Sequence, residues 1–231
     1  FKGDVEMEGL PDINATFMHL NIKQLTTNRS DINRVPLPPF QKGNYLKVPE
    51  NIAYLGRINF KGNFTGFFNN FVAYGNFNTA IGSIKSDISL KKDTVRHTYS
   101  YEGKIATTDF NIGKFLESED YLGKITLQAT IDGRGFEKST INTKLNGVVN
   151  SIDLYGYAYK NINIEGLFAD KIFEGKLNIE EENIDLAFNG NVNLADTLPV
   201  FDFSAQLKNA NLSNLQILKD RRGAHVVAEP A

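Results

Sequence analysis

The sequence predicts an all-β protein: one elongated, mostly antiparallel curved sheet (a β-taco, or open groove) with an apolar concave face and short helical excursions. Alternating apolar and polar segments recur, with turn signals between them, at the spacing of about 8–12 residues typical of all-β folds. Connections such as Asp170–Lys171 are too short for a parallel crossover, which needs a dozen residues or more. Glycines also fall repeatedly on the apolar face of these segments. Together these observations favour an antiparallel meander that curls.

The alternating segments give the expected strands in chain order. Each segment is apolar on one face and rich in Asn, Lys, Asp and Thr on the other, so one face must be covered. That cover is either a second sheet, as in a dry sandwich, or whatever fills a groove. The expected strands are 3–8, 15–23, 55–64, 70–79, 82–92, 96–107, 121–132, 138–149, 151–159, 161–169, 171–180, 183–193 and 200–208.

Glycine in a strand weakens it and is usually kept for a bend or for the close approach of another group. Alternate side chains point to opposite faces, so a glycine in register with apolar residues points where they point. A whole series on one face indicates a sheet curling around something. These curvature glycines are Gly62, Gly75, Gly147, Gly156, Gly166, Gly175 and Gly190.

Two excursions interrupt the alternation, within a body (1–218) predicted to be a single elongated unit. Residues 26–50 are rich in proline, which cannot donate to a strand ladder, and we expect a short helical turn after Ser30 followed by extended chain. Residues 108–118 predict a second helical turn, capped by Thr108 or Asp109 and ending near Ser118. The tail 219–231 has no partner pattern, and its last ten residues differ from the Asn-rich body.

Composition excludes several classes of function. The formal net charge is −2 with both signs interspersed, so the basic stripe that a nucleic-acid-binding protein needs is missing. Without cysteine there is no disulfide framework, zinc ribbon or thiol catalysis. No stretch approaches the roughly 20 apolar residues of a membrane-spanning helix. A strand pattern runs from the first residue without a signal peptide, so we expect the interior of a longer protein.

Catalytic and metal-binding patterns are also missing. His19, His97 and His225 are widely separated and lie in no metal-binding spacing. The sequence contains no GxSxG, no P-loop and no GxGxxG that opens a helix. The run of glutamates at 180–182 is typical of a solvated hairpin tip. We therefore expect a non-enzymatic protein without cofactor or metal.

Aromatic residues allow two interpretations. In the expected strand 151–159, Tyr155, Tyr157 and Tyr159 lie opposite Ile152 and Leu154, so they form a ladder on the polar side. Such a ladder is either a docking strip for carbohydrate or protein, or cross-strand stabilisation, which we favour. A second group, in which a satellite core and a groove rim are equally expected, comprises Phe64, Phe67, Phe68, Phe71 and Phe77.

Residues 159–218 contain, in order, a YKNINIEG strand, a FEGKLNIEEENIDLAFNG hairpin, and a PVFDFSAQLKNANLSNL strand that runs into a leucine-spaced turn. This order of elements resembles the AsmA-like repeats of the TamB family. TTDFNIGKFL at 107–116 looks like the same strand-to-turn element in an earlier repeat. The segments LPDINATFMHLNIKQLTTNRSDINRVPLPPF and LGRINFKGNFTGFFNNFVAYGNFNTAIGSIKSDISL are similar to TamB-like proteins of Bacteroidetes-type bacteria.

The resemblance implies a fold, a location and partners. The family's sheet forms a long taco-shaped groove with an apolar lining, in a protein anchored in the inner membrane and extending through the periplasm. Bridge-like phospholipid transport to the outer membrane, and assistance to barrel assembly with a BamA-like partner, are the implied functions. The chain would then be an interior fragment of the periplasmic part of such an envelope protein.

The residues themselves support a groove for acyl chains. Glycines on the apolar face leave space where a sandwich needs bulk, and the face has almost none of the convergent polar groups that orient small ligands. Acyl chains need only apolar area, at about 0.8 kcal/mol per methylene shielded from water. The predicted lipid-groove residues are Ile58, Phe60, Ile84, Ile88, Ile125, Leu127, Ile131, Leu145, Ile152, Leu154, Ile162, Ile164, Phe173, Leu177, Ile184, Leu186, Phe188, Phe201 and Phe203.

Other readings of the sequence stay open. A dry core would use the same apolar stripe. An exposed sheet edge is a template for strand pairing, either with an outer-membrane protein or with a second copy of the chain. A carbohydrate-binding β-protein would instead use the Tyr and Asn side chains of the outer face.

Overall fold

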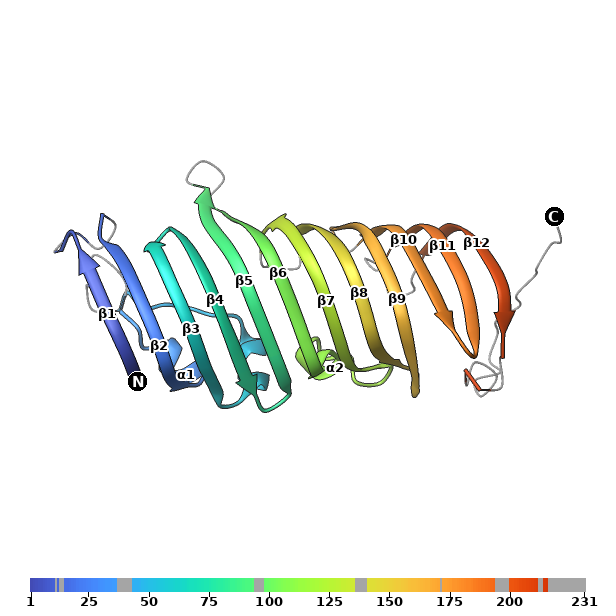
Figure 1. Ribbon diagram of the computed structural model, residues 1–231, viewed down its shortest axis with the longest axis horizontal. Coiled ribbons are helices and arrows are strands. Elements are labelled where there is room, and N and C mark those ends of the chain that lie inside the picture. Colours follow the sequence, from blue (N-terminus) through green and yellow to red (C-terminus); the bar gives the residue numbers. More distant parts are fainter. Residues whose placement is uncertain are drawn as a thin grey trace.

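The described part of the computed structural model is one antiparallel sheet of twelve strands, and it covers residues 1–10, 12, 15–36, 43–93, 98–135, 141–170, 172–193, 200–211 and 214–215. Among the described strands, spatial order equals chain order, so each strand pairs with its sequence neighbours and there is no crossover (Figure 1). The predicted all-β, antiparallel meander is confirmed. The strands are β1 (Lys2–Glu8), β2 (Phe17–Thr27), β3 (Ile58–Phe67), β4 (Asn70–Thr79), β5 (Gly82–Asp93), β6 (Thr98–Asn111), β7 (Leu122–Arg134), β8 (Asn142–Leu154), β9 (Tyr157–Ala169), β10 (Ile172–Glu181), β11 (Ile184–Asn193) and β12 (Val200–Ala210).

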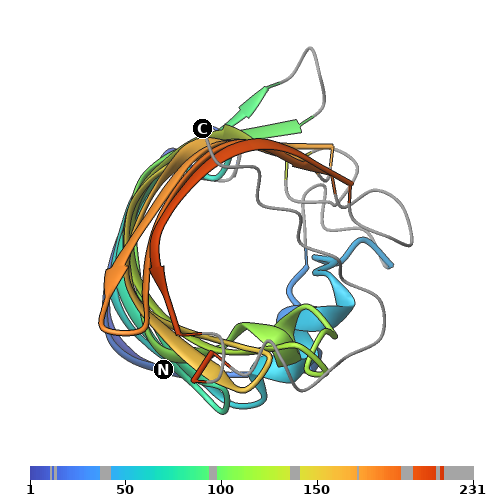
Figure 2. The same cartoon turned by 90° about the vertical axis from the view of Figure 1, so that its right-hand side faces the viewer.

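The strands curve along their own length, so the sheet seen along its long axis is an open arc (Figure 2). Irregular pairing accompanies this curvature: the register shifts between Ile22 and Leu25 in β2 and between Thr107 and Phe110 in β6. The second shift contains Asp109, whose φ of 47° is left-handed. A β-bulge inserts an extra residue, bends its strand and increases the local twist, so these shifts contribute to the curvature of the sheet.

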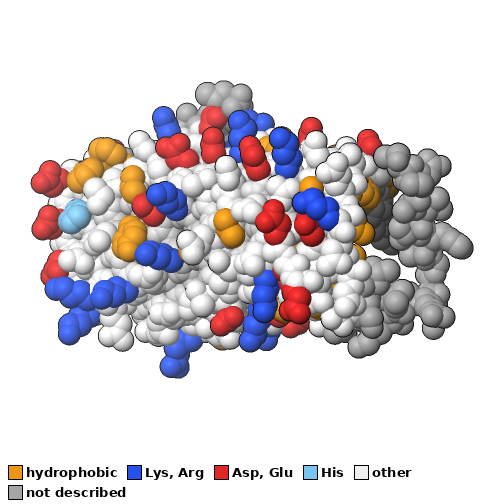
Figure 3. Space-filling view, turned by 45° about the vertical axis from the view of Figure 1, so that its right-hand side comes forward, with side chains coloured by type: hydrophobic (Ala, Val, Ile, Leu, Met, Phe, Trp, Pro, Cys, Tyr) orange, Lys and Arg blue, Asp and Glu red, His pale blue; other side chains and the backbone are white. Residues whose placement is uncertain are grey.

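The apolar face is the concave one. Three short helices, α1 (Arg29–Ile32), η1 (Glu50–Leu55) and α2 (Ile112–Phe115), lie inside one rim of the arc (Figure 2). Their apolar side chains form a cluster around Leu55 and Phe110 that also contains Phe77, Ile84 and Ile125 from the apolar face of the sheet. The convex face carries charged side chains of both signs, interspersed with one another (Figure 3).

An asparagine cap follows or ends three strands at the rim where the helices lie. Asn28 after β2 and Asn111 at the end of β6 cap helices, their side chains accepting hydrogen bonds from the backbone N–H of Asp31 and Lys114. Asn211 after β12 accepts one from Asn214 N–H in the same way, at 3.2 Å. Asparagine is a preferred N-cap because its side chain satisfies an N–H that the helix leaves unpaired. Each cap turns the chain back towards the concave side.

The expected boundary between strands 151–159 and 161–169 is wrong. β8 runs on to Leu154, Tyr155 and Gly156 form a two-residue turn with φ of 50° and 79°, and β9 starts at Tyr157. Two successive positive φ values characterise the hairpin turn whose twist matches the flanking strands. Gly156 is therefore a turn residue and not a curvature glycine within a strand.

The turn also reverses the assignment of two tyrosines. Tyr157 pairs with Leu154 and Tyr159 pairs with Ile152, so both stand on the apolar face, and the predicted ladder on the polar side is wrong. Tyr155 sits at the tip of the hairpin, 74% exposed.

The excursions also differ in detail. α1 begins at Arg29, one residue before Ser30, and the 3₁₀ helix η1 occupies the start of the expected strand 55–64, so β3 begins only at Ile58. The predicted helical turn 108–118 shrinks to α2, because β6 continues through its bulge and the cap is Asn111 rather than Thr108 or Asp109. His97, His225 and the tail 219–231 lie outside the described residues.

Candidate functional site

Cross-strand pairing aligns apolar residues of the concave face into rows parallel to the long axis of the molecule. Residues directly opposite each other share a face, so the register defines each row. One row is Leu25, Phe60, Phe77, Ile84, Thr107, Leu127, Val149, Ile162, Ile179, Leu186 and Leu207. Another is Val5, Leu20, Phe64, Ala73, Ile88, Gly103, Ile131, Leu145, Gly166, Gly175, Gly190 and Phe203. Neither row contains a charged residue.

The predicted groove residues lie on this face, in these rows or beside them. Phe201 pairs with Val192, in register with Phe173 two strands away, although its side chain is outside the described structure. Sequence alternation therefore grouped the apolar residues correctly within each strand.

The concave face is accessible and is not a dry core. Of the predicted residues, Ile58, Ile162 and Ile184 are buried, with 5–7% of their surface exposed. The other described members are only partly covered, and Phe203 on the last strand is 52% exposed. No second sheet packs on this face within the part of the chain that the structure describes. A sandwich would bury these side chains completely, so the sandwich alternative is not what the fold shows.

Paired glycines on the concave face lie under aromatic rings. Gly62 pairs with Gly75, and a Cβ at either position would come within 2.9 Å of Phe60 Cζ. Gly166 pairs with Gly175, and Phe173 Cζ would be 2.7 and 3.0 Å from their added Cβ atoms. Each ring therefore lies down on backbone that has no side chain, which covers the weak glycine pair with apolar surface. The sequence predicted the space at these positions, and the structure shows what fills it.

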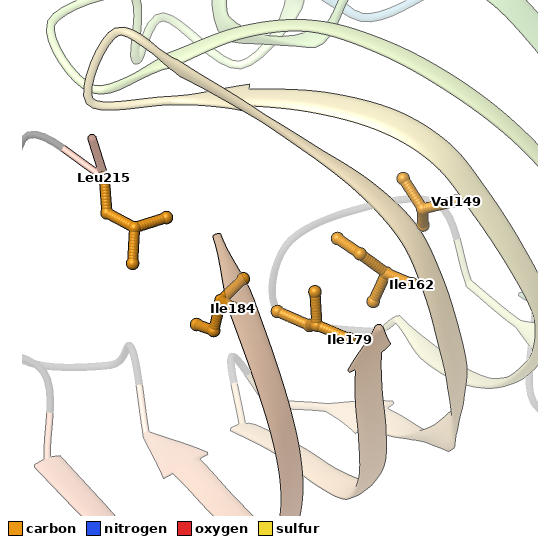
Figure 4. Close-up of a cluster of buried hydrophobic side chains, with 5 residues drawn as sticks. All are labelled: Val149, Ile162, Ile179, Ile184 and Leu215. Carbon is orange, nitrogen blue, oxygen red and sulfur yellow. The ribbon is translucent and has the colours of Figure 1, made fainter. Parts of the chain in front are cut away.

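One rim of the concave face is closed by the capped turns. Leu55 of η1 and Phe110 of β6 are buried there, and at the other end of the sheet Leu215 is only 1% exposed. Leu215 packs with Ile184 and with the sheet residues Val149, Ile162 and Ile179 (Figure 4). The covering elements thus hold the lower part of the arc in shape.

A hydrogen-bonded phenol stands at this rim. Tyr157 Oη donates to Glu181 Oε1 at 2.7 Å and accepts from Asn183 Nδ2 at 2.9 Å. Burial, together with the hydrogen bond to Glu181, raises the pKa of Tyr157, and burial raises the pKa of Tyr159. Both phenols are therefore neutral at physiological pH and add no charge to the face. Sequence alternation placed both tyrosines on the polar face because it did not reveal the Tyr155–Gly156 turn.

The predicted phenylalanine group divides between the two faces. Phe64 stacks on Phe71 with ring centroids 4.4 Å apart, and Phe77 on Phe60 at 4.6 Å, all on the concave face. Phe67 instead meets Phe17 edge to face on the convex side, at 5.6 Å. Phe68 is in the β3–β4 turn.

The described residues contain no arrangement of side chains typical of a catalytic site. They contain no cluster of three or more His, Asp or Glu side chains that could hold a metal ion. His19 is exposed on the convex face, with Nδ1 2.9 Å from Thr65 Oγ1. Of the glutamates at 180–182, Glu181 is the partner of Tyr157, which is a structural role.

In the described part of the chain, helices are too short or too polar to cross a bilayer. Comparisons of the sequence with protein-family models and with curated proteins, and of the fold with solved structures, returned no match.

Proposed function

We propose that the concave face binds the hydrocarbon chains of phospholipids, and that the chain is a segment of a periplasmic bridge along which lipids pass between the inner and outer membranes of a bacterial envelope. The observation that carries this proposal is the uncharged row from Val5 to Phe203, which crosses the sheet from β1 to β12 and stays partly accessible along its whole length. The resemblance to the TamB family points in the same direction.

The geometry suits transfer better than tight binding. Twelve strands at about 4.8 Å spacing give a path of roughly 50 Å. Every shielded methylene contributes about 0.8 kcal/mol wherever it lies along that path, so a tail can slide without breaking specific bonds. The head group stays in water at the open side of the arc. Tyr157 and Tyr159 also lie on this face, and because both phenols are neutral they add no charge to the path.

A charge on the concave face tests the proposal. Leu186→Arg places a guanidinium near one end of an apolar row, and burying it against acyl chains is costly without a partner. The matched control is Ala187→Arg, because Ala187 is the next residue on the same strand and is exposed on the convex face. Native mass spectrometry with lipid extraction should find phospholipid on the wild type and on Ala187→Arg, and little on Leu186→Arg.

Two results would overturn the lipid proposal. One is a folded wild type that carries no phospholipid after purification or after incubation with liposomes. The other is a folded Leu186→Arg protein with normal lipid occupancy. Circular dichroism on both arginine variants separates lost binding from lost folding.

A second candidate function is strand addition at the sheet edges, with a BamA-like outer-membrane barrel or a second copy of the chain as partner. Apolar side chains are exposed along both terminal strands: Val5 and Met7 are 49% and 43% exposed on β1, and Leu207 is 56% exposed on β12. An open edge of this kind is a template for another strand.

Proline at the edge discriminates this function from lipid binding. Alternate residues of β12 direct their backbone N–H groups towards β11 or away from it. Ser204 and Ala205 are neighbours, so either Ser204→Pro or Ala205→Pro removes an N–H donor from the open edge of the sheet. That variant should lose dimerisation, or binding to a BamA-like barrel, while it keeps bound phospholipid. Unchanged association of both folded variants would contradict strand addition.

A further inference from the structure

The convex face carries a row of exposed side chains that no concave-face function uses. The register aligns Lys61, Asn76, Lys85, Ala106, Gln128, Val148, Asn163, Asn178, Ala187 and Gln206, one residue from each strand between β3 and β12. We call this set the amide row. It contains five carboxamides, two ammonium groups and no carboxylate, on a face where both charge signs are otherwise interspersed (Figure 3).

The row is hollowed at both of its alanines. Around Ala106 there is a depression of about 430 Å³, flanked along the row by Lys85 and Gln128 and bordered by Tyr74, Asp87, Lys104 and Asn146. Around Ala187 there is a second depression of about 230 Å³, flanked by Asn178 and Gln206 and bordered by Lys176, Asn189 and Ser204. In each case a methyl group stands between two long polar side chains, which leaves a hollow with polar walls.

The carboxamides of the row are not used by the fold. The side chains of Gln128, Asn163, Asn178 and Gln206 make no hydrogen bond to another described residue. The contrast lies one row away on the same face, where Asn59 accepts from Thr26 at 2.8 Å and Asn78 accepts from Ser83 at 2.9 Å. Those amides stabilise the sheet, whereas the amides of the row keep their donors and acceptors for solvent or a ligand.

We propose that the amide row binds an extended β-1,4-linked polysaccharide that carries acetamido groups. Three properties select this class of ligand. A carboxamide both donates and accepts, which matches sugar hydroxyls and the amide of an N-acetyl group. Tyr74, 40% exposed, borders the first hollow with Lys85 Nζ over its ring, 5.8 Å from the centroid, so a phenol and an ammonium group are both within reach of sugar hydroxyls. The rise per ring of such a chain is close to the strand spacing of about 4.8 Å, so successive sugars meet successive strands.

The spacing of the hollows sets the length of the ligand. Ala106 and Ala187 lie on β6 and β11, five strand intervals or about 24 Å apart along the row. A hexasaccharide reaches both hollows and a disaccharide reaches only one. Two linked contacts bind more tightly than either alone because the second forms within the complex.

Calorimetric titration with chitohexaose tests the proposal. The wild type should bind in the millimolar range or tighter, chitobiose at least tenfold more weakly, and cellohexaose, which lacks acetamido groups, more weakly than chitohexaose. The double variant Gln128→Ala/Asn178→Ala removes one amide beside each hollow, and loss of two hydrogen bonds predicts a Kd about thirtyfold higher. Asn191→Ala is the matched control, since it removes a convex-face amide outside the row and should leave the Kd within twofold.

The chitohexaose titration can be interpreted independently of lipid binding. Ala187→Arg fills one hollow and should weaken chitohexaose binding while phospholipid stays bound, whereas Leu186→Arg should do the reverse. Absence of chitohexaose binding by the folded wild type at millimolar concentration overturns the proposal. So does equal binding by the wild type and the double variant, or equal affinity for the disaccharide and the hexasaccharide.

Discussion

Alternate residues of the same strands form the concave and the convex face, yet the two faces differ in how their side chains pack. On the concave face, glycines pair across strands and phenylalanine rings lie on them, so side-chain packing is close and partly sheltered. On the convex face, long polar side chains stand in water with few partners. Changes to the first should therefore act on stability and apolar binding, and changes to the second on recognition alone.

The largest difference is expected from a branched side chain placed on each face. At Gly175 a Cβ would come within 2.5 Å of Gly166 Cα, which is backbone and cannot move aside cheaply. We expect Gly175→Val to lower the free energy of unfolding by about 3 kcal/mol. Ala187→Val, on the exposed face, should change it by less than about 0.5 kcal/mol. Urea unfolding measures both, and similar values for the two variants would remove the proposed contrast in packing.

An intermediate effect is expected at the rim. Tyr157→Phe deletes the hydrogen bonds to Glu181 and Asn183 and should cost about 1 kcal/mol. The pKa of Tyr157 is raised in the folded state, so the folded protein holds this proton more firmly than the unfolded chain. The stability that results is fully present below the ordinary pKa of 10.0 and is lost as the pH rises above it.

The pH profile provides the check for this tyrosine. Wild-type protein should lose stability more steeply than Tyr157→Phe when unfolding is followed from pH 9 towards pH 11, around the ordinary tyrosine pKa of 10.0. Parallel profiles would mean that the phenol titrates alike in the folded and unfolded states.

The smallest effect is expected for an ion pair on the convex face. Lys23 Nζ lies 3.0 Å from Asp4 Oδ2, with both side chains more than half exposed. Exposed pairs contribute little because water and salt screen them, so Asp4→Asn should cost at most about 0.5 kcal/mol, and less in 0.5 M salt. A larger loss in thermal unfolding would show that the edge strand β1 depends on this pair.

Much of the architecture could be predicted from local alternation, because period-two patterning fixes which side chains share a face within one strand. The fold class, the meander and the apolar residues of the concave face followed from it. Errors arose where the pattern continued by coincidence. Ile152, Leu154 and Gly156 keep the same parity, which concealed a turn that places Tyr155 at a φ of 50°. A tyrosine is an unusual residue at such a position, so no turn signal was present.

Features that depend on register between strands could not be predicted. The bulge at Asp109 in β6 and the left-handed residue Asn161 (φ 52°) in β9 shift parity within their strands without any local composition signal. The stacking of Phe60 over Gly75 and the hollows at Ala106 and Ala187 need the exact partner on the neighbouring strand. Pairing that spans strands is tertiary information, and alternation within one segment does not contain it.

Because every strand pairs only with its neighbours in the chain, the described sheet has no long-range contact that ties its two ends together. Its stability is then close to a sum over adjacent hairpin interfaces, as in a one-dimensional chain of coupled units. Such a molecule can begin to fold at any hairpin and can lose strands one at a time from either end, starting with the seven-residue β1. Its unfolding should therefore spread along the sheet rather than occur in a single all-or-none step, and an added or deleted hairpin would change the length of the protein without changing its design.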